Sequence, residues 1–167
     1  SAKLQDMAAL ITGGDSGIGR AVAVLFAREG ADVCIVALSS EEDARETQRR
    51  VEEEGRRCEV VLGDVKDPAF CRQAVDRTVD AFGRLDILVN NAAYQQHQSS
   101  LDDLSLEQWD HTLKTNIYGY FNMVKAAHTH LRDGSTIINT GSITGLDGSG
   151  ALLDYSATKG AIHAFTK

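Results

Sequence analysis

The sequence predicts an α/β fold in which helices cover both faces of one parallel sheet. Short apolar runs alternate along the chain with segments of helical periodicity. The apolar runs show little alternation with polar residues, which is typical of strands buried on both faces. Strands are expected at 7–12, 32–38, 58–65, 85–93 and 135–143, and helices at 17–29, 41–54, 68–82, 106–131 and from about 154 onward.

Residues at the ends of these segments support their boundaries. Gly30 follows the first helix, as glycine often does at a helix C-terminus. Asp67 and Pro68 have the order of an N-cap and a first helical proline, and residues 105–108 have capping-box spacing. The charged segment 40–57 pairs Glu with Arg three and four residues apart, which is typical of a solvated helix face.

Length and composition predict one domain spanning residues 1–167. Hydrophobic residues make up 43% of the chain and charged residues 25%, as in ordinary globular proteins. A net charge of −7 disfavours a nucleic-acid partner. No apolar run approaches a membrane span, and no signal peptide opens the sequence. The three cysteines lack disulfide or metal-ligand spacing, and Glu107, Asp110 and His111 show no metal-site arrangement, so we expect a cytoplasmic protein without a metal.

A glycine-rich loop follows the first predicted strand and leads directly into the first helix. Gly13, Gly17 and Gly19 form the pattern G-x-x-x-G-x-G. Glycine permits a sharp turn and a close approach of backbone to pyrophosphate, and a helix N-terminus favours anions. Because the loop opens a βαβ unit, it predicts a dinucleotide phosphate site. Gly14 has no assigned role in this pattern.

The end of the second predicted strand bears on the choice between NAD and NADP. A carboxylate there binds the adenosine ribose 2′-hydroxyl, whereas a nearby arginine accommodates a 2′-phosphate. Residues 37–40 read Ala-Leu-Ser-Ser and supply neither group. The missing acid favours NADP slightly, with Ser39 or Ser40 as a hydrogen-bond partner of the phosphate. An equally good interpretation is that Ser39 caps the next helix and Glu42 completes a capping box.

Tyr155 and Lys159 stand four residues apart on the last predicted helix. That spacing puts both side chains on one face, about one turn apart. An ammonium group beside a phenol favours the phenolate, and such a phenol can exchange a proton with an alcohol or carbonyl oxygen. Taken alone, the pair has a more ordinary interpretation as a half-buried tyrosine beside a lysine whose stem packs on apolar surface. The motifs around it favour the chemical interpretation.

The ordered motifs resemble those of the short-chain dehydrogenase/reductase family across the whole chain. They are "TGGDSGIG" (12–19), "GDV" (63–65), "NNAA" (90–93), "NTGS" (139–142) and "YSATK" (155–159). The resemblance implies a Rossmann-type doubly wound sheet with strand order 3-2-1-4-5. It also implies hydride transfer between NAD(P) and a small alcohol or carbonyl substrate.

The resemblance implies roles for individual residues as well. Tyr155 would be the general acid/base, Lys159 would favour its ionised form and bind the nicotinamide ribose, and Ser142 would hydrogen-bond the substrate oxygen. Asn116 matches the family asparagine that holds a water for a proton relay behind the lysine. Besides Tyr155 and Lys159, the expected cofactor contacts are Gly13, Asp15, Ser16, Ile18 and Gly19 in the glycine loop, Ser39 after the second strand, Asp64 and Val65 at the adenine, and Asn90 and Ala92 along the ribose.

One residue departs from the family pattern, and three phrases point to one branch of the family. Ala93 stands where the family usually has glycine, and its methyl group would crowd the ribose contact slightly. The phrases "TGGDSGIGRAVA", "NNAAYQQ" and "LLDYSATKGAI" are similar to the bacterial glucose/ribitol dehydrogenase-type branch, which implies a polyol, sugar or small alcohol as substrate. In the polar run 94–100, Gln95, Gln96 and His97 either face substrate hydroxyls or form an exposed loop.

The strands and helices that the family has after the tyrosine helix find no counterpart in residues 1–167, so we expect a C-terminally incomplete domain. Its last strand would lie at an exposed edge. The resemblance implies a homo-tetramer that associates through helices 106–131 and 154 onward. Two functions stay open: an NAD(P)-dependent oxidoreductase, and a non-catalytic nucleotide-binding module or inactive fragment. A flavodoxin-like or receiver domain is disfavoured, because the glycine loop differs and no acidic cluster follows the first strand.

Overall fold

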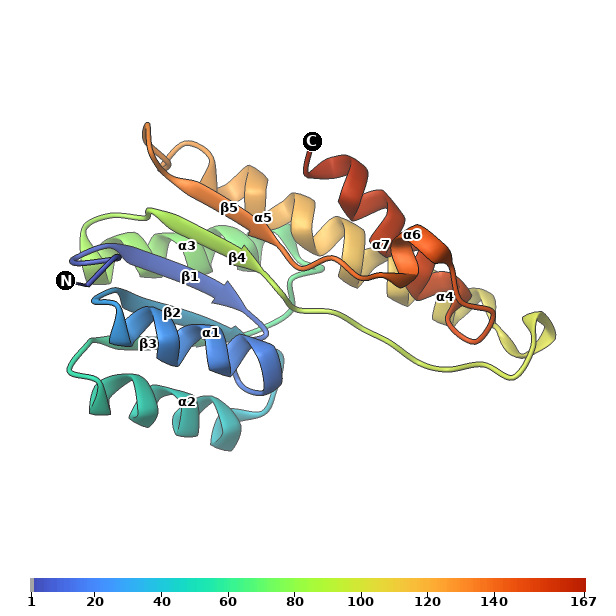
Figure 1. Ribbon diagram of the computed structural model, residues 1–167, viewed down its shortest axis with the longest axis horizontal. Coiled ribbons are helices and arrows are strands. Elements are labelled where there is room, and N and C mark those ends of the chain that lie inside the picture. Colours follow the sequence, from blue (N-terminus) through green and yellow to red (C-terminus); the bar gives the residue numbers. More distant parts are fainter. Residues whose placement is uncertain (1) are drawn as a thin grey trace.

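Five parallel strands form the central sheet of the computed structural model, which describes residues 2–167 (Figure 1). The order in the sheet is β3-β2-β1-β4-β5, and all four strand pairs are parallel. The predicted doubly wound fold is therefore confirmed, with β5 at one edge. The strands are β1 (Ala8–Thr12), β2 (Asp32–Ala37), β3 (Cys58–Leu62), β4 (Ile87–Asn90) and β5 (Thr136–Asn139).

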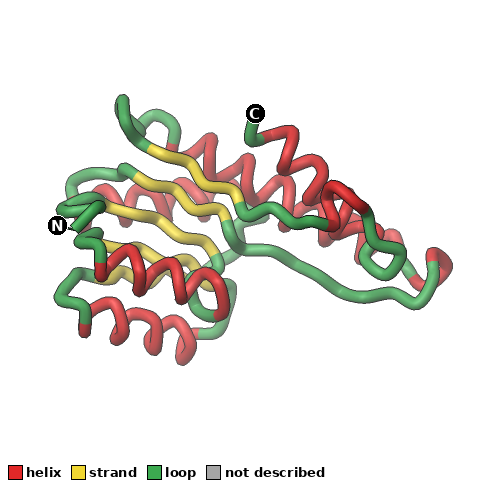
Figure 2. The backbone as a smooth tube through the Cα atoms, viewed as in Figure 1, coloured by secondary structure: helices red, strands yellow, loops and turns green. Residues whose placement is uncertain are grey.

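Helices cover both faces of the sheet, as Figure 2 shows. Side chains of neighbouring strand residues point to opposite faces, so Ile11 packs with α1 and α2 whereas Leu10 packs with α3 and α5. The two resulting cores explain why the strands read as continuous apolar runs. The helices are α1 (Gly17–Arg28), α2 (Glu41–Glu53), α3 (Pro68–Phe82), α4 (Leu106–Leu113), α5 (Gly119–Ala127), α6 (Thr144–Asp147) and α7 (Leu153–Phe165).

The helix predicted at 106–131 is divided and shorter. A π-helical segment, Lys114–Tyr118, separates α4 from α5. The run ends at Ala127 because its last turn tightens, with the N–H of His130 donating to the Ala127 carbonyl three residues back. The short helix α6 and a 3₁₀ turn, Leu101–Asp103, were not predicted.

Helix starts were predicted with mixed success. The Asp67 side chain accepts from the N–H of Ala69 at 2.9 Å, and Ser105 accepts from the N–H of Gln108 at 3.1 Å, which confirms both caps. The interpretation of Ser39 as a cap is wrong. The residue before α2 is Ser40, and its hydroxyl donates to Asp43 Oδ2 at 2.6 Å rather than capping the helix backbone.

Within residues 2–167, no helix combines the length and apolar character that a membrane crossing needs. The same residues contain no group of three or more His, Cys, Asp or Glu side chains arranged to hold a metal ion. All three cysteines, Cys34, Cys58 and Cys71, are buried and free. Burial raises the pKa of the Cys34 thiol to about 12, so this side chain behaves as a small apolar residue.

Candidate functional site

The glycine loop turns from β1 into α1 at the carboxyl end of the sheet. Gly13 and Gly17 have φ of 63° and 52°, in the left-handed region that favours glycine. A Cβ at Gly19 would lie 1.9 Å from the carbonyl oxygen of Gly13, so no side chain fits there without movement. The loop is therefore built for close backbone packing, and it ends at the N-terminus of the 12-residue helix α1.

Gly14 has a packing role that the sequence pattern did not reveal. A Cβ at this position would lie 2.5 Å from Cγ2 of Ile35 on β2. The loop backbone is further held by a hydrogen bond from the N–H of Gly14 to the carbonyl of Val36, at 3.2 Å. Gly14 thus lets the glycine loop lie directly on the end of β2.

A cleft of about 470 Å³ opens over the carboxyl ends of β1, β2, β3 and β4. This is where ligands bind in open parallel sheets, because the strand order reverses there between β1 and β4. The cleft brings together the glycine loop and the residues that follow β2, β3 and β4. Gly13 and Ala93, for example, are 80 positions apart in the sequence. Eight predicted cofactor residues line it: Gly13, Asp15, Ser16, Ile18, Ser39, Asp64, Val65 and Ala92.

Four predicted cofactor residues do not line the cleft. Gly19 is buried against Gly13, for the packing reason given above. Asn90 is fully buried, and its Nδ2 donates to Oδ1 of Asn139 at 3.0 Å, which ties β4 to β5. Tyr155 and Lys159 lie on α7 and are not among the residues that line the cleft. Gly19 and Asn90 therefore stabilise the backbone around the cleft without lining it.

The cleft also contains residues that the motifs did not single out: Lys66, Asn91, Tyr94, His111 and Thr115. Lys66 Nζ lies 2.7 Å from Asp64 Oδ2. Burial alone would raise the pKa of Asp64, but the hydrogen bonds and charge of Lys66 outweigh it and lower that pKa. Lys66 directly follows "GDV" and was visible in the sequence, whereas His111 and Thr115 reach the cleft only through folding.

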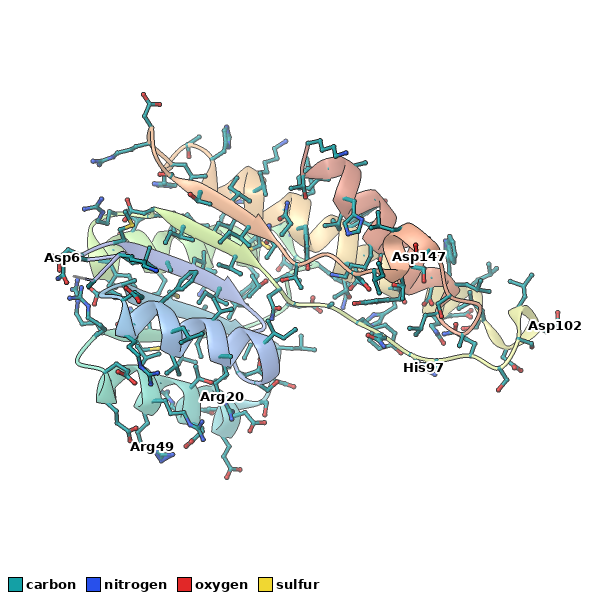
Figure 3. The ribbon with its side chains drawn as sticks, viewed as in Figure 1. Asp6, Arg20, Arg49, His97, Asp102 and Asp147 are labelled. Carbon is teal, nitrogen blue, oxygen red and sulfur yellow. The ribbon has the colours of Figure 1, made fainter. Side chains whose placement is uncertain are left out.

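Arg20 brings a positive charge to the start of α2. Its Nε donates to Oγ1 of Thr47 at 2.9 Å, and Nη2 donates to the carbonyl of Asp15 and lies 3.5 Å from Asp43 Oδ1. Figure 3 labels Arg20 on α1, which lies beside α2. Arg20 was not predicted as a cation for this site, because it comes from the first helix and not from the segment after the second strand.

Tyr155 and Lys159 lie together on α7, as their spacing predicts. Lys159 Nζ is 5.6 Å from the centroid of the Tyr155 ring. The ammonium group donates to the carbonyl of Thr140 at 2.6 Å and to the hydroxyl of Tyr120 at 3.1 Å. Thr140 directly follows β5, so these bonds fix the pair at the carboxyl edge of the sheet.

The burial of Lys159 changes its acid–base behaviour. Its side chain is fully buried. Burial disfavours the charged form and lowers the pKa of Lys159 to about 8. Tyr155 itself is half-buried, so its ring is held while part of it stays accessible.

Asn116 links the segment after β4 to α7. It is fully buried in the π-helical segment. Its Oδ1 accepts from the N–H of Tyr94 at 2.8 Å, and Nδ2 donates to the Tyr94 carbonyl at 3.0 Å and to Thr158 Oγ1 at 3.1 Å. The Thr158 hydroxyl in turn lies 2.7 Å from the Tyr155 carbonyl. Both amide hydrogens are therefore engaged, and only Oδ1 keeps a lone pair for a water.

Ser142 lies in the segment between β5 and α6. Its half-buried hydroxyl is 2.9 Å from Thr144 Oγ1 and accepts from the N–H of Thr144 at 3.2 Å. The backbone N–H of Ser142 points to Nε2 of His163 on α7, at 3.3 Å. This hydrogen bond joins the backbone of Ser142 to the helix that carries Tyr155.

A buried polar network surrounds the start of α7. Asp154 is fully buried, and its Oδ2 accepts from the Thr112 hydroxyl at 2.5 Å and from Gln108 Nε2 at 3.3 Å. Gln108 Nε2 also donates to the carbonyl of Gln96 at 3.4 Å. The network joins α4, α7 and the polar run 94–100. No motif predicts this network, because Asp154 is only one of many acidic residues in the sequence.

Three side chains of the polar run 94–100 face solvent, whereas Gln98 is buried. Gln95, Gln96 and His97 are all exposed. Figure 3 labels His97 on the extended segment that leads from β4 away from the sheet. A hydrogen bond from the N–H of Gln98 to the carbonyl of Ala151, at 2.9 Å, holds this segment beside the chain that precedes α7.

Comparison with known proteins agrees with this geometry. The sequence pattern of the family described as short chain dehydrogenase matches residues 7–167. Uncharacterized oxidoreductase YhdF of Bacillus subtilis (strain 168) is 55% identical over 167 residues, which cover 100% of this chain and 58% of that protein. Glucose and ribitol dehydrogenase of Daucus carota is 45% identical over 177 residues, covering 99% of this chain and 59% of that protein.

A solved structure shares the fold closely. The crystal structure of a short chain dehydrogenase from Burkholderia cenocepacia J2315 in complex with NADP matches with a TM-score of 0.94 and 42% identity. The match covers 98% of this chain and 67% of that one. Fold, motifs and relatives define a nucleotide-dependent oxidoreductase architecture, and the chain belongs to the short-chain dehydrogenase/reductase family. It spans 58% and 59% of the length of the two curated relatives.

Proposed function

We propose that the chain is the cofactor-binding and catalytic part of an NAD(P)-dependent oxidoreductase that interconverts an alcohol and a carbonyl compound. The observation that carries the proposal is the pairing of Tyr155 with Lys159, 5.6 Å from ring centroid to Nζ, at the sheet edge where the cleft opens. A merely structural tyrosine would not need a fully buried lysine beside it, because burying an ammonium group is costly.

Tyr155 acts as the general acid/base in this proposal. When bound, the nicotinamide group supplies or accepts the hydride. Tyr155 gives its hydroxyl proton to the carbonyl oxygen during reduction and takes a proton from the alcohol during oxidation. The ammonium of Lys159 stabilises the phenolate that reduction leaves behind. Ser142 holds the substrate oxygen by a hydrogen bond, for which its hydroxyl turns from Thr144.

Asn116 and Lys159 replace the proton that Tyr155 gives up. Oδ1 of Asn116 is the acceptor for a water, since its two amide hydrogens are engaged with the Tyr94 carbonyl and Thr158. That water lies behind Lys159 in the proposed relay. A lysine with a pKa of about 8 exchanges protons readily near neutral pH, which suits this task.

The cleft fits the pyrophosphate end of the cofactor. Gly13 has no space for a side chain, because a Cβ would lie 3.0 Å from Cα of Ala92, whereas Gly17 is open with nothing within 4 Å. Phosphates bind well at the N-terminus of a helix such as α1. Asp15, Ser16 and Ile18 would surround the phosphates, Asp64 and Val65 the adenine, Ala92 the ribose, and Lys159 the nicotinamide ribose.

NADP is favoured slightly over NAD. The end of β2 carries no carboxylate, and Ser39 lines the cleft there. Arg20 lies near the start of α2, where its guanidinium is paired with Asp43 and would have to turn to reach a 2′-phosphate. The Burkholderia structure, of similar sequence, holds NADP.

The proposed substrate is a polyol, sugar or small alcohol and its carbonyl counterpart. The name of the carrot relative supports this class. Exposed Gln95, Gln96 and His97 would offer hydrogen bonds to substrate hydroxyls, provided that they turn toward α7 when substrate binds.

We further propose that residues 1–167 form one incomplete domain of a cytoplasmic homo-tetramer. Three exposed aromatic side chains support an assembly surface, because they line an apolar hollow of about 380 Å³ between α5 and α7. They are Tyr118, Phe121 and Phe165.

An assay of cofactor turnover tests the function. NADPH or NADH is mixed with the chain and a panel of aldose sugars and small aldehydes, and loss of the reduced cofactor is followed. The enzyme hypothesis predicts consumption that depends on the carbonyl compound. Binding of NADPH without consumption by any compound favours the alternative, a non-catalytic nucleotide-binding module or inactive fragment.

A further inference from the structure

His111 lines the cleft although it belongs to none of the family motifs. It is half-buried on α4, beside Tyr94 and Thr115 in the cleft wall. The imidazole and the Tyr94 ring lie 4.4 Å apart between centroids, with an angle of 85° between their planes. Aromatic pairs prefer this edge-to-face arrangement, so each ring holds the other in place.

The helical run that carries His111 is attached to the chain that leaves β3. Asn122 Nδ2 donates to the carbonyl of Val65 at 3.0 Å. A Cβ at Gly119 would lie 2.7 Å from Cγ2 of Val65, so the two backbones approach closely. The aromatic pair therefore shares the cleft with Asp64 and Val65, while Asn116 joins the backbone of Tyr94 to Thr158 of α7.

Electrostatics agree with this position. Burial and the contacts with Lys66 have the largest influence on the pKa of Asp64, and the charge of a nearby protonated His111 lowers it further. The end of β2 contributes Val36 and Leu38 to the same cleft. One end of the cleft thus combines aliphatic side chains with a fixed aromatic pair, which is a surface suited to a flat apolar ring system.

We propose that His111 and Tyr94 form an aromatic wall against which the adenine base of the cofactor packs. The inference rests on the proposed cofactor site and adds to it a contact from His111, which no quoted motif contains. Every purine has a π face, and packing of a base on an aromatic side chain contributes substantially to nucleotide binding. The wall needs the ring of His111 rather than its hydrogen-bonding atoms.

Binding measurements on four proteins test the wall. Isothermal titration with ADP, which carries the adenine half alone, and with NADPH is performed on the unchanged chain and on His111→Ala, His111→Phe and His128→Ala. His128 is the matched control, since it is exposed at the end of α5 and lies outside the cleft. His111→Gln replaces the alanine variant if that variant loses its helical circular dichroism.

The aromatic wall predicts the same loss for both ligands. His111→Ala weakens ADP and NADPH about 5- to 10-fold each, because both carry adenine. His111→Phe stays within about threefold of the unchanged chain, and His128→Ala within about twofold. An unchanged affinity in His111→Ala, or a loss for NADPH but not ADP, overturns the wall. If the unchanged chain binds neither ligand, the proposed cofactor site fails and the wall with it.

Discussion

Lys159 donates a hydrogen bond of 2.6 Å to the carbonyl of Thr140, which joins the middle of α7 to the residue that follows β5. This bond fixes the ammonium group 5.6 Å from the centroid of the Tyr155 ring, and surrounding residues bury the lysine side chain completely. The charge is therefore available to the phenol, and its burial must be offset by other parts of the fold.

The buried ammonium makes stability depend on pH. The folded pKa of Lys159 is about 8, below the ordinary value of an unfolded lysine. Between these two pKa values the unfolded chain binds more protons than the folded chain, so the free energy of unfolding rises with pH. The rise amounts to about 3 kcal/mol in total. Below pH 8 the lysine is charged in both states, and the folded chain bears the full cost of burying it. Urea unfolding at a series of pH values measures this rise.

Lys159→Met should remove that rise, because the variant has no group to titrate at this position. Lys125→Met is the control, since Lys125 is exposed and should keep the pH dependence of the unchanged chain. Equal pH dependence in both variants would show that Lys159 titrates normally.

The glycine loop predicts a second outcome. Gly19→Ala introduces a methyl group 1.9 Å from the carbonyl of Gly13, so the loop must move. We expect the free energy of unfolding to fall by about 1–3 kcal/mol and NADPH affinity to fall with it. Gly150→Ala serves as the control, because its added methyl group meets nothing within 4 Å and its φ is not left-handed. Chemical denaturation and NADPH titration of both variants decide the matter, and a neutral Gly19→Ala contradicts the close packing.

The buried carboxylate of Asp154 makes Thr112 important for stability. Thr112→Val keeps the shape of the side chain but removes the hydroxyl that donates to Asp154 Oδ2. Asp154 Oδ2 then keeps only the longer bond from Gln108, so we expect the free energy of unfolding to fall by about 1–3 kcal/mol. Thr112→Ser should restore most of this stability, and Thr129→Val, at an exposed position, should change little. Thermal unfolding that ranks Thr112→Val with Thr129→Val would argue against the network.

The sheet was the part of the fold that local sequence predicted best. Continuous apolar runs mark strands buried on both faces, and here Ile11 and Leu10 indeed pack into different cores. Periodicity could not show the π-helical segment around Asn116, because the helical hydrophobic pattern continues through it. Nor could it show α6, which has only four residues and too little pattern of its own.

For the site residues, too, local patterns were predicted well and contacts between distant segments were not. Residues within one short segment, such as Tyr155 and Lys159, were predicted to lie together because helix geometry fixes their spacing. Contacts between distant segments, such as Asn116 with Thr158 or Asp154 with Thr112, depend on tertiary packing and had no local signal. Arg20 shows the limit most clearly, since its charge acts near α2 but comes from α1.

The proton transfer assigned to Tyr155 is tested most directly by Tyr155→Phe. The variant keeps the ring that packs near Lys159 and removes only the hydroxyl. With a carbonyl substrate found in the turnover panel, we predict that kcat falls by about 10²- to 10⁴-fold while the Kd of NADPH stays within about twofold. A Tyr155→Phe variant that turns over at the unchanged rate would contradict the account.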